Sequence, residues 1–85
     1  MTMKANDIIT YATATGMNIE INANEFGEQI IGIEWKNNSV WYWFAELLDG
    51  EMLFTERYSM RNGTIKSGFN MTAIKIEKTI TASVQ

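Results

Sequence analysis

The acidic and aromatic side chains in the middle of the chain are the ones that could do chemistry. Glu34 and Glu56 flank Trp41 and Trp43 in the sequence, and glycosidases place their acid and base as a pair of carboxylates. Glutamates on neighbouring strands of a half-exposed sheet give the same pattern without catalysis, and a domain of 85 residues rarely encloses a deep cleft. We therefore expect no catalytic residues and a protein that is not an enzyme.

The composition excludes most other catalytic and metal chemistry. The chain has no Cys and no His, so thiolate nucleophiles, disulfides, histidine bases and the usual zinc ligands are all missing. The Asp49-Gly50-Glu51 group lacks the alternating ligands of a calcium loop and indicates the tip of a hairpin. No glycine-rich phosphate-binding motif is present. We expect neither a metal nor a cofactor.

The aromatic residues favour a binding function. Trp, Tyr and Phe are enriched in the cores of protein interfaces, where a few of them carry most of the binding energy. The same rings could stack the bases of a single-stranded nucleic acid or a nucleotide, which is the alternative function. The candidate partner-binding residues are Glu34, Trp41, Trp43, Phe54, Glu56 and Tyr58.

The charge is unevenly distributed along the chain, whose net charge is −3. Residues 1–54 hold eight acidic residues against two lysines, whereas residues 55–85 hold five basic residues against two glutamates. Arg57, Arg61 and Lys66 are the candidates for contact with a phosphate or an acidic partner. Because the predicted strands also carry several glutamates, the attraction to phosphates would be weak. Protein binding is therefore the preferred interpretation.

The length and composition indicate one α+β domain spanning residues 1–85. The chain is 46% hydrophobic and contains no Pro, no repeat and no linker-like segment. It shows neither a signal peptide nor an apolar run long enough to cross a membrane, so we expect a cytoplasmic protein. A helix is predicted over 7–15, with Asn6 as its N-terminal cap and Gly16 as the residue that ends it.

Alternating apolar residues predict a three- to four-stranded antiparallel meander after this helix. We expect strands over 17–23, 29–36, 39–48 and 51–58, with two-residue turns at Asn37-Asn38 and Asp49-Gly50. If Leu48 pairs with Glu51, then the cross-strand partners are Trp43 with Glu56, Trp41 with Tyr58 and Ala45 with Phe54.

Both faces of the predicted sheet are apolar, so both need a cover. This register places on one face Ile31, Ile33, Trp35, Val40, Tyr42, Phe44 and Leu53, and on the other Ile30, Gly32, Trp41, Trp43, Ala45, Leu47, Met52, Phe54 and Tyr58. Gly32 lies opposite Trp43 and leaves room for the indole to lie flat. Either the two helices cover opposite faces, or one helix layer is complemented by a partner chain, which we favour. Homodimerisation through the second face is the first such arrangement that we expect.

The C-terminal third permits two interpretations. Thr64 can cap a helix in which Ile65, Phe69, Thr72 and Ile76 follow helical spacing. Many residues after 71 are β-branched, however, and their alternation would also suit a closing strand near 79–84. We expect a C-terminal helix and leave the last residues open.

Residues 41–75 resemble the repeat of the YegP-like family of small bacterial domains. That repeat combines a Trp-x-Trp strand, an Asn/Asp-Gly-Glu turn, a second strand that ends in Glu-x-Tyr, and a helix. The corresponding residues here are Trp41, Trp43, Asp49, Gly50, Glu51, Glu56, Tyr58, Gly68, Phe69 and Lys75. Thr55 and Phe69 replace the usual Ser and Ile, and Asn62-Gly63 interrupts the expected start of the helix. The resemblance implies a β-hairpin packed on a helix and a paired or dimeric arrangement, with no established chemistry.

The order of elements is also similar to that of small phage anti-CRISPR proteins, which often place a short helix before an antiparallel sheet and end in a helix. This resemblance implies a phage-encoded inhibitor directed at a host defence protein such as a CRISPR nuclease. Together with the aromatic face, it leads us to expect a binding or inhibitory module whose partner is another protein or a second copy. We expect no membrane contact.

Overall fold

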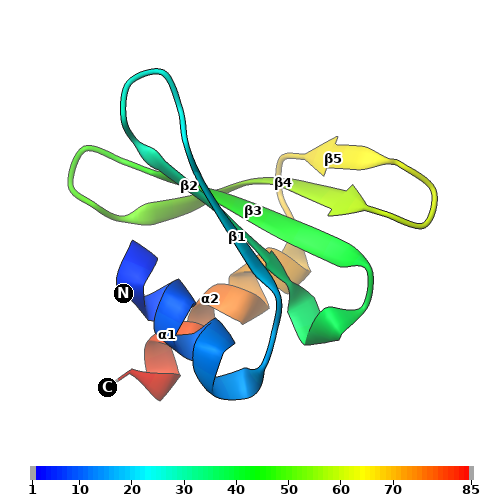
Figure 1. Ribbon diagram of the computed structural model, residues 1–85, viewed down its shortest axis with the longest axis horizontal. Helices are drawn as coiled ribbons and strands as arrows, with labels where there is room; N and C mark the ends of the chain where they lie inside the picture. Colours follow the sequence, from blue (N-terminus) through cyan, green and yellow to red (C-terminus); the bar gives the residue numbers. More distant parts are fainter. Residues whose placement is uncertain (1, 85) are drawn as a thin grey trace.

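A computed structural model describes residues 2–84, and it contains a five-stranded antiparallel sheet and two α-helices (Figure 1). The strand order β1-β2-β3-β4-β5 follows the sequence, which confirms the predicted α+β meander with one more strand than expected. The elements are α1 (Ala5–Thr15), β1 (Ile19–Ala23), β2 (Gln29–Glu34), the 3₁₀ turn η1 (Trp35–Asn37), β3 (Val40–Glu46), β4 (Met52–Ser59), β5 (Ile65–Ser67) and α2 (Met71–Ser83).

Helix α1 begins two residues earlier than predicted, and Asn6 is not its cap. Lys4 occupies the cap position, and its backbone N–H donates to Asp7 Oδ2 at 2.9 Å. The Asp7 carboxylate in the first turn also suits the partial positive charge of the helix start. The predicted end is confirmed, because Gly16 adopts the left-handed conformation with φ of 72°.

The connection between β2 and β3 is not the predicted Asn37-Asn38 hairpin. Strand β2 ends at Glu34, and the chain then makes η1, where Lys36, Asn37 and Ser39 have positive φ. Asn37 Oδ1 accepts the backbone N–H of Asn18 at 3.0 Å, which ties this turn to the chain before β1. Side-chain hydrogen bonds thus replace the two-residue turn.

The register between β3 and β4 differs from the prediction at one end only. Leu47 donates its N–H to the carbonyl of Glu51, so the hairpin loop is longer than Asp49-Gly50 and Glu46 pairs with Met52. A β-bulge at Thr55 inserts one extra residue, so the predicted partners Trp43 with Glu56 and Trp41 with Tyr58 are confirmed. Between the loop and the bulge, residues 52–54 of β4 therefore lie on the sheet faces opposite to those predicted.

The predicted pair of Ala45 with Phe54 is therefore wrong. Phe54 pairs with Phe44, and Ala45 pairs with Leu53. Phe54 and Met52 consequently share the core face with Phe44, and Leu53 takes the opposite face.

The C-terminal helix begins later than predicted, at Met71. Thr64 is not its cap, because the Thr64 side chain donates to Asn62 Oδ1 within the preceding turn and the next residues pair with β4 as β5. Asn70 is the cap, and its Oδ1 accepts the backbone N–H of Ala73 at 2.9 Å. The helix continues through Ser83, so residues 79–84 form no closing strand.

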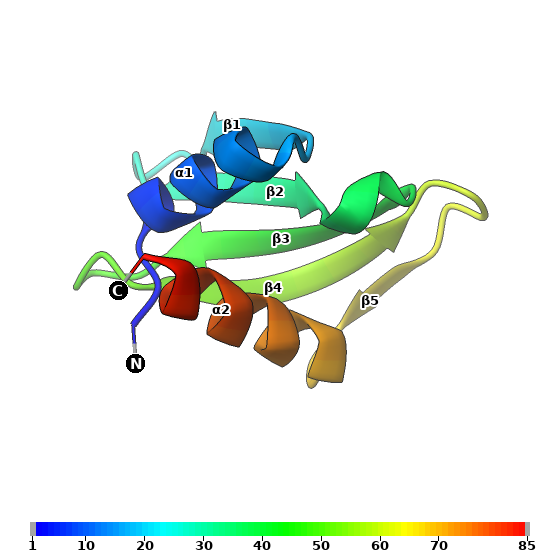
Figure 2. The same ribbon diagram turned by 90° about the horizontal axis from the view of Figure 1, so that it is seen from below.

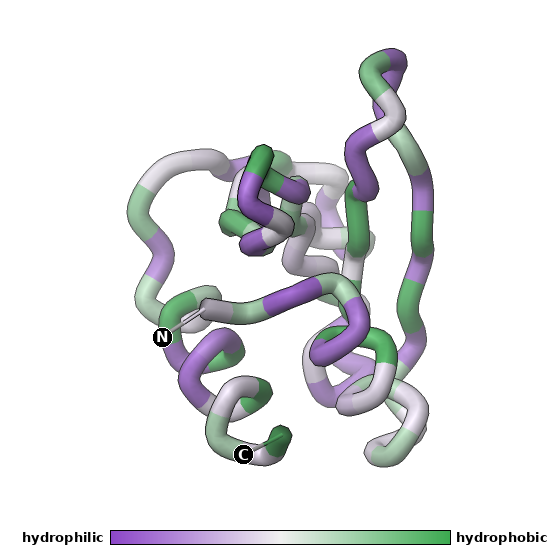
Figure 3. Tube along the Cα trace, turned by 90° about the vertical axis from the view of Figure 1, so that its left-hand side faces the viewer, coloured by the Kyte–Doolittle hydropathy of each residue, from purple (hydrophilic) through white to green (hydrophobic). Residues whose placement is uncertain are grey.

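Both helices cover the same face of the sheet (Figures 2 and 3). The alternation of hydrophobic and hydrophilic residues along β1 is visible in Figure 3. The two ends of the chain lie side by side on the helix-covered side in both ribbon views. The buried core between helices and sheet consists of Met3, Ile8, Ala12, Ile31, Ile33, Tyr42, Phe44, Met52, Ala73, Ile76 and Ile80.

Candidate functional site

The face of the sheet that points away from the helices carries the predicted aromatic residues, and we refer to it as the open face. Cross-strand partners point to the same side of a sheet, so the register assigns its members. Both helices lie on the other side of the sheet, as the favoured arrangement with one helix layer requires, whereas the partner chain of that arrangement stays a prediction. The residues of the open face are Glu20, Asn22, Ile30, Gly32, Glu34, Trp41, Trp43, Ala45, Leu53, Glu56, Tyr58, Ile65 and Ser67.

Trp41 and Trp43 form a stacked pair at the centre of the open face. They are two residues apart on β3, their ring centroids lie 6.0 Å apart and their planes meet at 22°. The Trp43 indole lies over Gly32 as predicted, since a Cβ there would approach three ring atoms to 2.8 Å. The Trp41 Nε1–H lies 3.0 Å from Met60 Sδ. Both rings are thus held in place by their own chain, although both remain half-exposed.

Glu34 lies beside Trp41 as predicted, but its carboxylate is occupied. Oε2 accepts the backbone N–H of Ser39 at 2.7 Å, and Oε1 accepts the Asn18 side-chain amide at 2.8 Å. The residue is only 9% exposed. These contacts hold the η1 connection and the start of β1, so Glu34 supports the site and its carboxylate has little access to a partner.

Glu56 and Glu20 are the two carboxylates of the open face that stay accessible. Glu56 is half-exposed and pairs with Trp43. Glu20 is exposed and pairs with Gly32, the residue over which the Trp43 indole lies. Within residues 2–84 neither side chain has a hydrogen-bond or ion-pair partner. Sequence reasoning missed Glu20, although its place in the alternating pattern of β1 was a usable signal.

Phe54, which was predicted to bind a partner, lies in the wrong place for that role. Its ring packs against Tyr42 and Phe44 on the core face, with centroid distances of 6.4 and 5.9 Å. The bulge at Thr55 is the cause. Leu53, at 53% exposure, occupies the open face instead.

Met60, beside Trp41, and Ile65, beside Tyr58, are further apolar residues near the site that sequence reasoning missed. They are 57% and 62% exposed. Ile65 pairs with Tyr58 across β4 and β5. The helical spacing after Thr64 predicted Ile65 to lie in a helix, so its place on the sheet was missed.

The three predicted phosphate-contacting residues do not join the aromatic rings. Arg57 pairs with the buried Tyr42, and Lys66 pairs with Arg57, so both lie on the helix-covered side of the sheet. Arg61 lies in the β4–β5 turn and donates to Asn38 Oδ1 at 2.9 Å. The open face therefore combines aromatic rings with carboxylates and has no basic strand residue.

Two shallow hollows lie side by side on the open face and share Trp43. One has a volume of 240 Å³ and is lined by Glu20, Trp41, Trp43, Tyr58 and Met60. The other has a volume of 430 Å³ and is lined by Ile30, Trp43, Ala45, Thr55 and Glu56. Their walls are side chains of a sheet surface, which suits contact with another macromolecule better than enclosure of a substrate.

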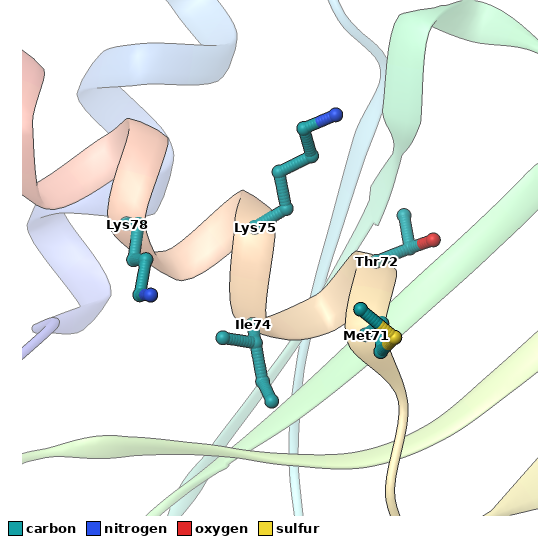
Figure 4. Close-up of a pocket in the computed structure, with 5 residues that line it drawn as sticks. All are labelled: Met71, Thr72, Ile74, Lys75 and Lys78. Atoms are coloured by element: carbon teal, nitrogen blue, oxygen red, sulfur yellow. The ribbon is translucent and has the colours of Figure 1, made fainter.

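A hollow of 410 Å³ on the outer side of α2 lacks converging polar groups (Figure 4). It is lined by Met71, Thr72, Ile74, Lys75 and Lys78. Figure 4 shows the Lys75 and Lys78 side chains pointing in different directions. Their ammonium groups therefore do not form a common anion site.

The carboxylates of Glu34 and Glu56 do not lie on adjacent strands. Glu34 and Glu56 lie on β2 and β4, on either side of β3, and the Glu34 oxygens are engaged. Among residues 2–84, no group of three or more acidic side chains is arranged to hold a metal ion. Neither helix of this part of the chain has the length and apolar character needed to cross a membrane.

The chain matches no protein-family model, and no curated protein or solved structure is significantly similar to it. The resemblances to YegP-like domains and to anti-CRISPR proteins consequently stay predictions. Any proposal about function must rest on the open face itself.

Proposed function

We propose that the protein is a non-catalytic binding module that holds another protein against its open face. The observation that carries this proposal is the stacked pair of Trp41 and Trp43 at the centre of a sheet face that neither helix covers. Large aromatic residues in this position are typical of interface hot spots. Exposed apolar patches rimmed by polar residues are typical of protein interaction sites.

The rigidity of the aromatic pair supports this proposal. Gly32 lets the Trp43 indole lie on the sheet, and Met60 contacts the Trp41 indole nitrogen. Because the rings are already fixed by their own chain, binding would require little further loss of side-chain freedom. Leu53 and Ile65 extend the apolar surface on both sides of Tyr58 and Glu56.

The distribution of charge favours a protein partner over a nucleic acid. Stacked bases would bring phosphates close to Glu20 and Glu56, while Arg57 and Lys66 lie on the other side of the sheet. Phosphate binding depends on basic residues near the stacking rings. Inhibition of a bacterial defence nuclease is one form that binding to a protein could take, and it stays a prediction.

The proposal is tested with open-face variants and matched controls. Trp41→Ala and Trp43→Ala change the open face without altering its charge, whereas Phe26→Ala and Phe69→Ala remove exposed rings, 79% and 83% exposed, elsewhere on the surface. Proteins retained from a bacterial lysate by the tagged chain are identified by mass spectrometry, and the purified partner is then titrated calorimetrically. Circular dichroism verifies that each variant is folded.

We expect the open-face variants to weaken the dissociation constant at least about tenfold and the controls to leave it unchanged. Equal binding by all four folded variants contradicts the proposal. Retention of nuclease-sensitive nucleic acid, lost in Trp41→Ala, supports the alternative of a stacking surface. Sedimentation of the isolated chain distinguishes a second copy from a different protein as the partner.

A further inference from the structure

We propose that the aromatic hollow, lined by Glu20, Trp41, Trp43, Tyr58 and Met60, receives an arginine side chain from a basic segment of the partner protein. This inference rests on the proposed function and specifies the chemistry of the partner. It commits the open face to a cationic occupant.

The rings of the hollow suit a planar cation. Trp binds cations over its face more strongly than Tyr or Phe does, and arginine is the side chain most often found there. The guanidinium group is planar and weakly hydrated, so it can stack on an indole while its edge donates hydrogen bonds. The hollow has a volume of 240 Å³ and offers Trp41, Trp43 and Tyr58 around one space.

The charge of the hollow points to the same occupant. Glu20 is part of its wall, and Glu56 lies beyond Trp43 on the neighbouring strand. Within residues 2–84 both carboxylates lack a partner, and the paired residues of the open face include no base to neutralise them. A partner cation would therefore meet aromatic faces and an unpaired carboxylate together.

Other occupants fit the charge less well. A nucleic acid would bring phosphates to the two free carboxylates. A second copy docked by its own open face would add the same glutamates and no base. A purely apolar surface would remove water from Glu20 without replacing its hydrogen bonds, which is unfavourable.

The inference is tested by NMR titration of the ¹⁵N-labelled chain with acetylated and amidated tetra-arginine. Tetra-citrulline, which has the same shape without the charge, and tetra-lysine are the comparison peptides. The indole N–H signals of Trp41 and Trp43 report directly on occupation of the hollow. Trp35 serves as an internal reference, because it stacks on Tyr11 away from the hollow with ring centroids 5.9 Å apart. We expect saturable shifts of the Trp41 and Trp43 signals with tetra-arginine, weaker ones with tetra-lysine and none with tetra-citrulline.

Substitution of two exposed glutamates, one in the hollow and one outside it, distinguishes binding in the hollow from general charge attraction. Glu20→Gln should weaken tetra-arginine binding about two- to fivefold, whereas Glu25→Gln, in the β1–β2 turn, removes the same charge and should have little effect. Equal shifts with tetra-citrulline, or equal weakening by the two variants, would overturn the inference.

The outcome also separates this inference from the proposed function. If the purified partner depends on Trp41 but tetra-arginine causes no indole shift, the face binds by apolar contact and only the inference fails. If tetra-arginine binds as expected but no protein depends on the open face, the proposed function fails alone.

Discussion

The Trp43 indole lies so close to the α-carbon of Gly32 that a methyl group there would approach three of its ring atoms to 2.8 Å. The two residues are direct cross-strand partners on β2 and β3. The Trp43 ring therefore occupies the space that a side chain at position 32 would need. This contact fixes the height of the aromatic pair above the sheet.

Gly32→Ala is expected to lift the Trp43 ring from the sheet and to destabilise the protein by about 1–3 kcal/mol, the usual cost of inserting a methyl group into a packed contact. Urea unfolding measures the loss of stability, and tryptophan fluorescence measures the change around the indole. The matched background is Trp43→Ala, in which the added methyl group meets no ring. If Gly32→Ala is equally destabilising in both backgrounds, the contact is not the cause.

Glu34→Gln is expected to destabilise the protein by about 1–3 kcal/mol. Both carboxylate oxygens accept hydrogen bonds, from Ser39 and Asn18, and a carboxamide can offer only one oxygen to these two donors. Glu20→Gln is the control on the same face, and a change within about 0.5 kcal/mol is expected there because Glu20 is exposed. Equal midpoints of urea unfolding for the two variants would contradict this role of Glu34.

Asn70→Ala is expected to cost about 1 kcal/mol, because it removes the oxygen that accepts the Ala73 N–H at the start of α2. Asn6→Ala is the matched control, since Asn6 lies inside α1 and caps nothing. Thermal unfolding of both variants is the measurement. A larger loss for Asn6→Ala would show that α1 begins where the sequence predicted.

Phe54→Ala is expected to cost about 3 kcal/mol, the low end for a core Phe, since its ring packs against Tyr42 and Phe44 but is only partly buried. Leu53→Ala should change stability little, because Leu53 is 53% exposed on the open face. Chemical unfolding of the two single variants therefore tests the bulge at Thr55. Without the bulge and the longer loop, Leu53 would be the residue sensitive to truncation.

The register of the aromatic rows could be predicted from the sequence, whereas the register of the neighbouring loop could not. The longer loop at Leu47 to Glu51 shifts the pairing by one residue, and the bulge at Thr55 shifts it back. The two deviations cancel at Trp41 and Trp43. They do not cancel at Phe54, whose face was therefore predicted wrongly.

Capping residues and helical spacing alone were insufficient to predict where α2 begins. Thr64 and Asn70 are both good capping residues, and the helical spacing after Thr64 fits either start. The choice depends on β4, which pairs with residues 65–67 and leaves the helix to begin at Met71. The role of Glu34 was hidden in the same way, because its partner Asn18 lies far away in the sequence.

The proximity of the two chain ends on the side opposite the open face also permits a rearranged polypeptide order. Exposed ends that lie side by side are the condition under which circular permutation is tolerated. A short linker could join the ends next to α1 and α2, and a cut in the exposed turn at residues 61–63 would open the chain elsewhere. Such a permutant keeps every strand pairing and the aromatic hollow, while its new ends lie next to the binding surface.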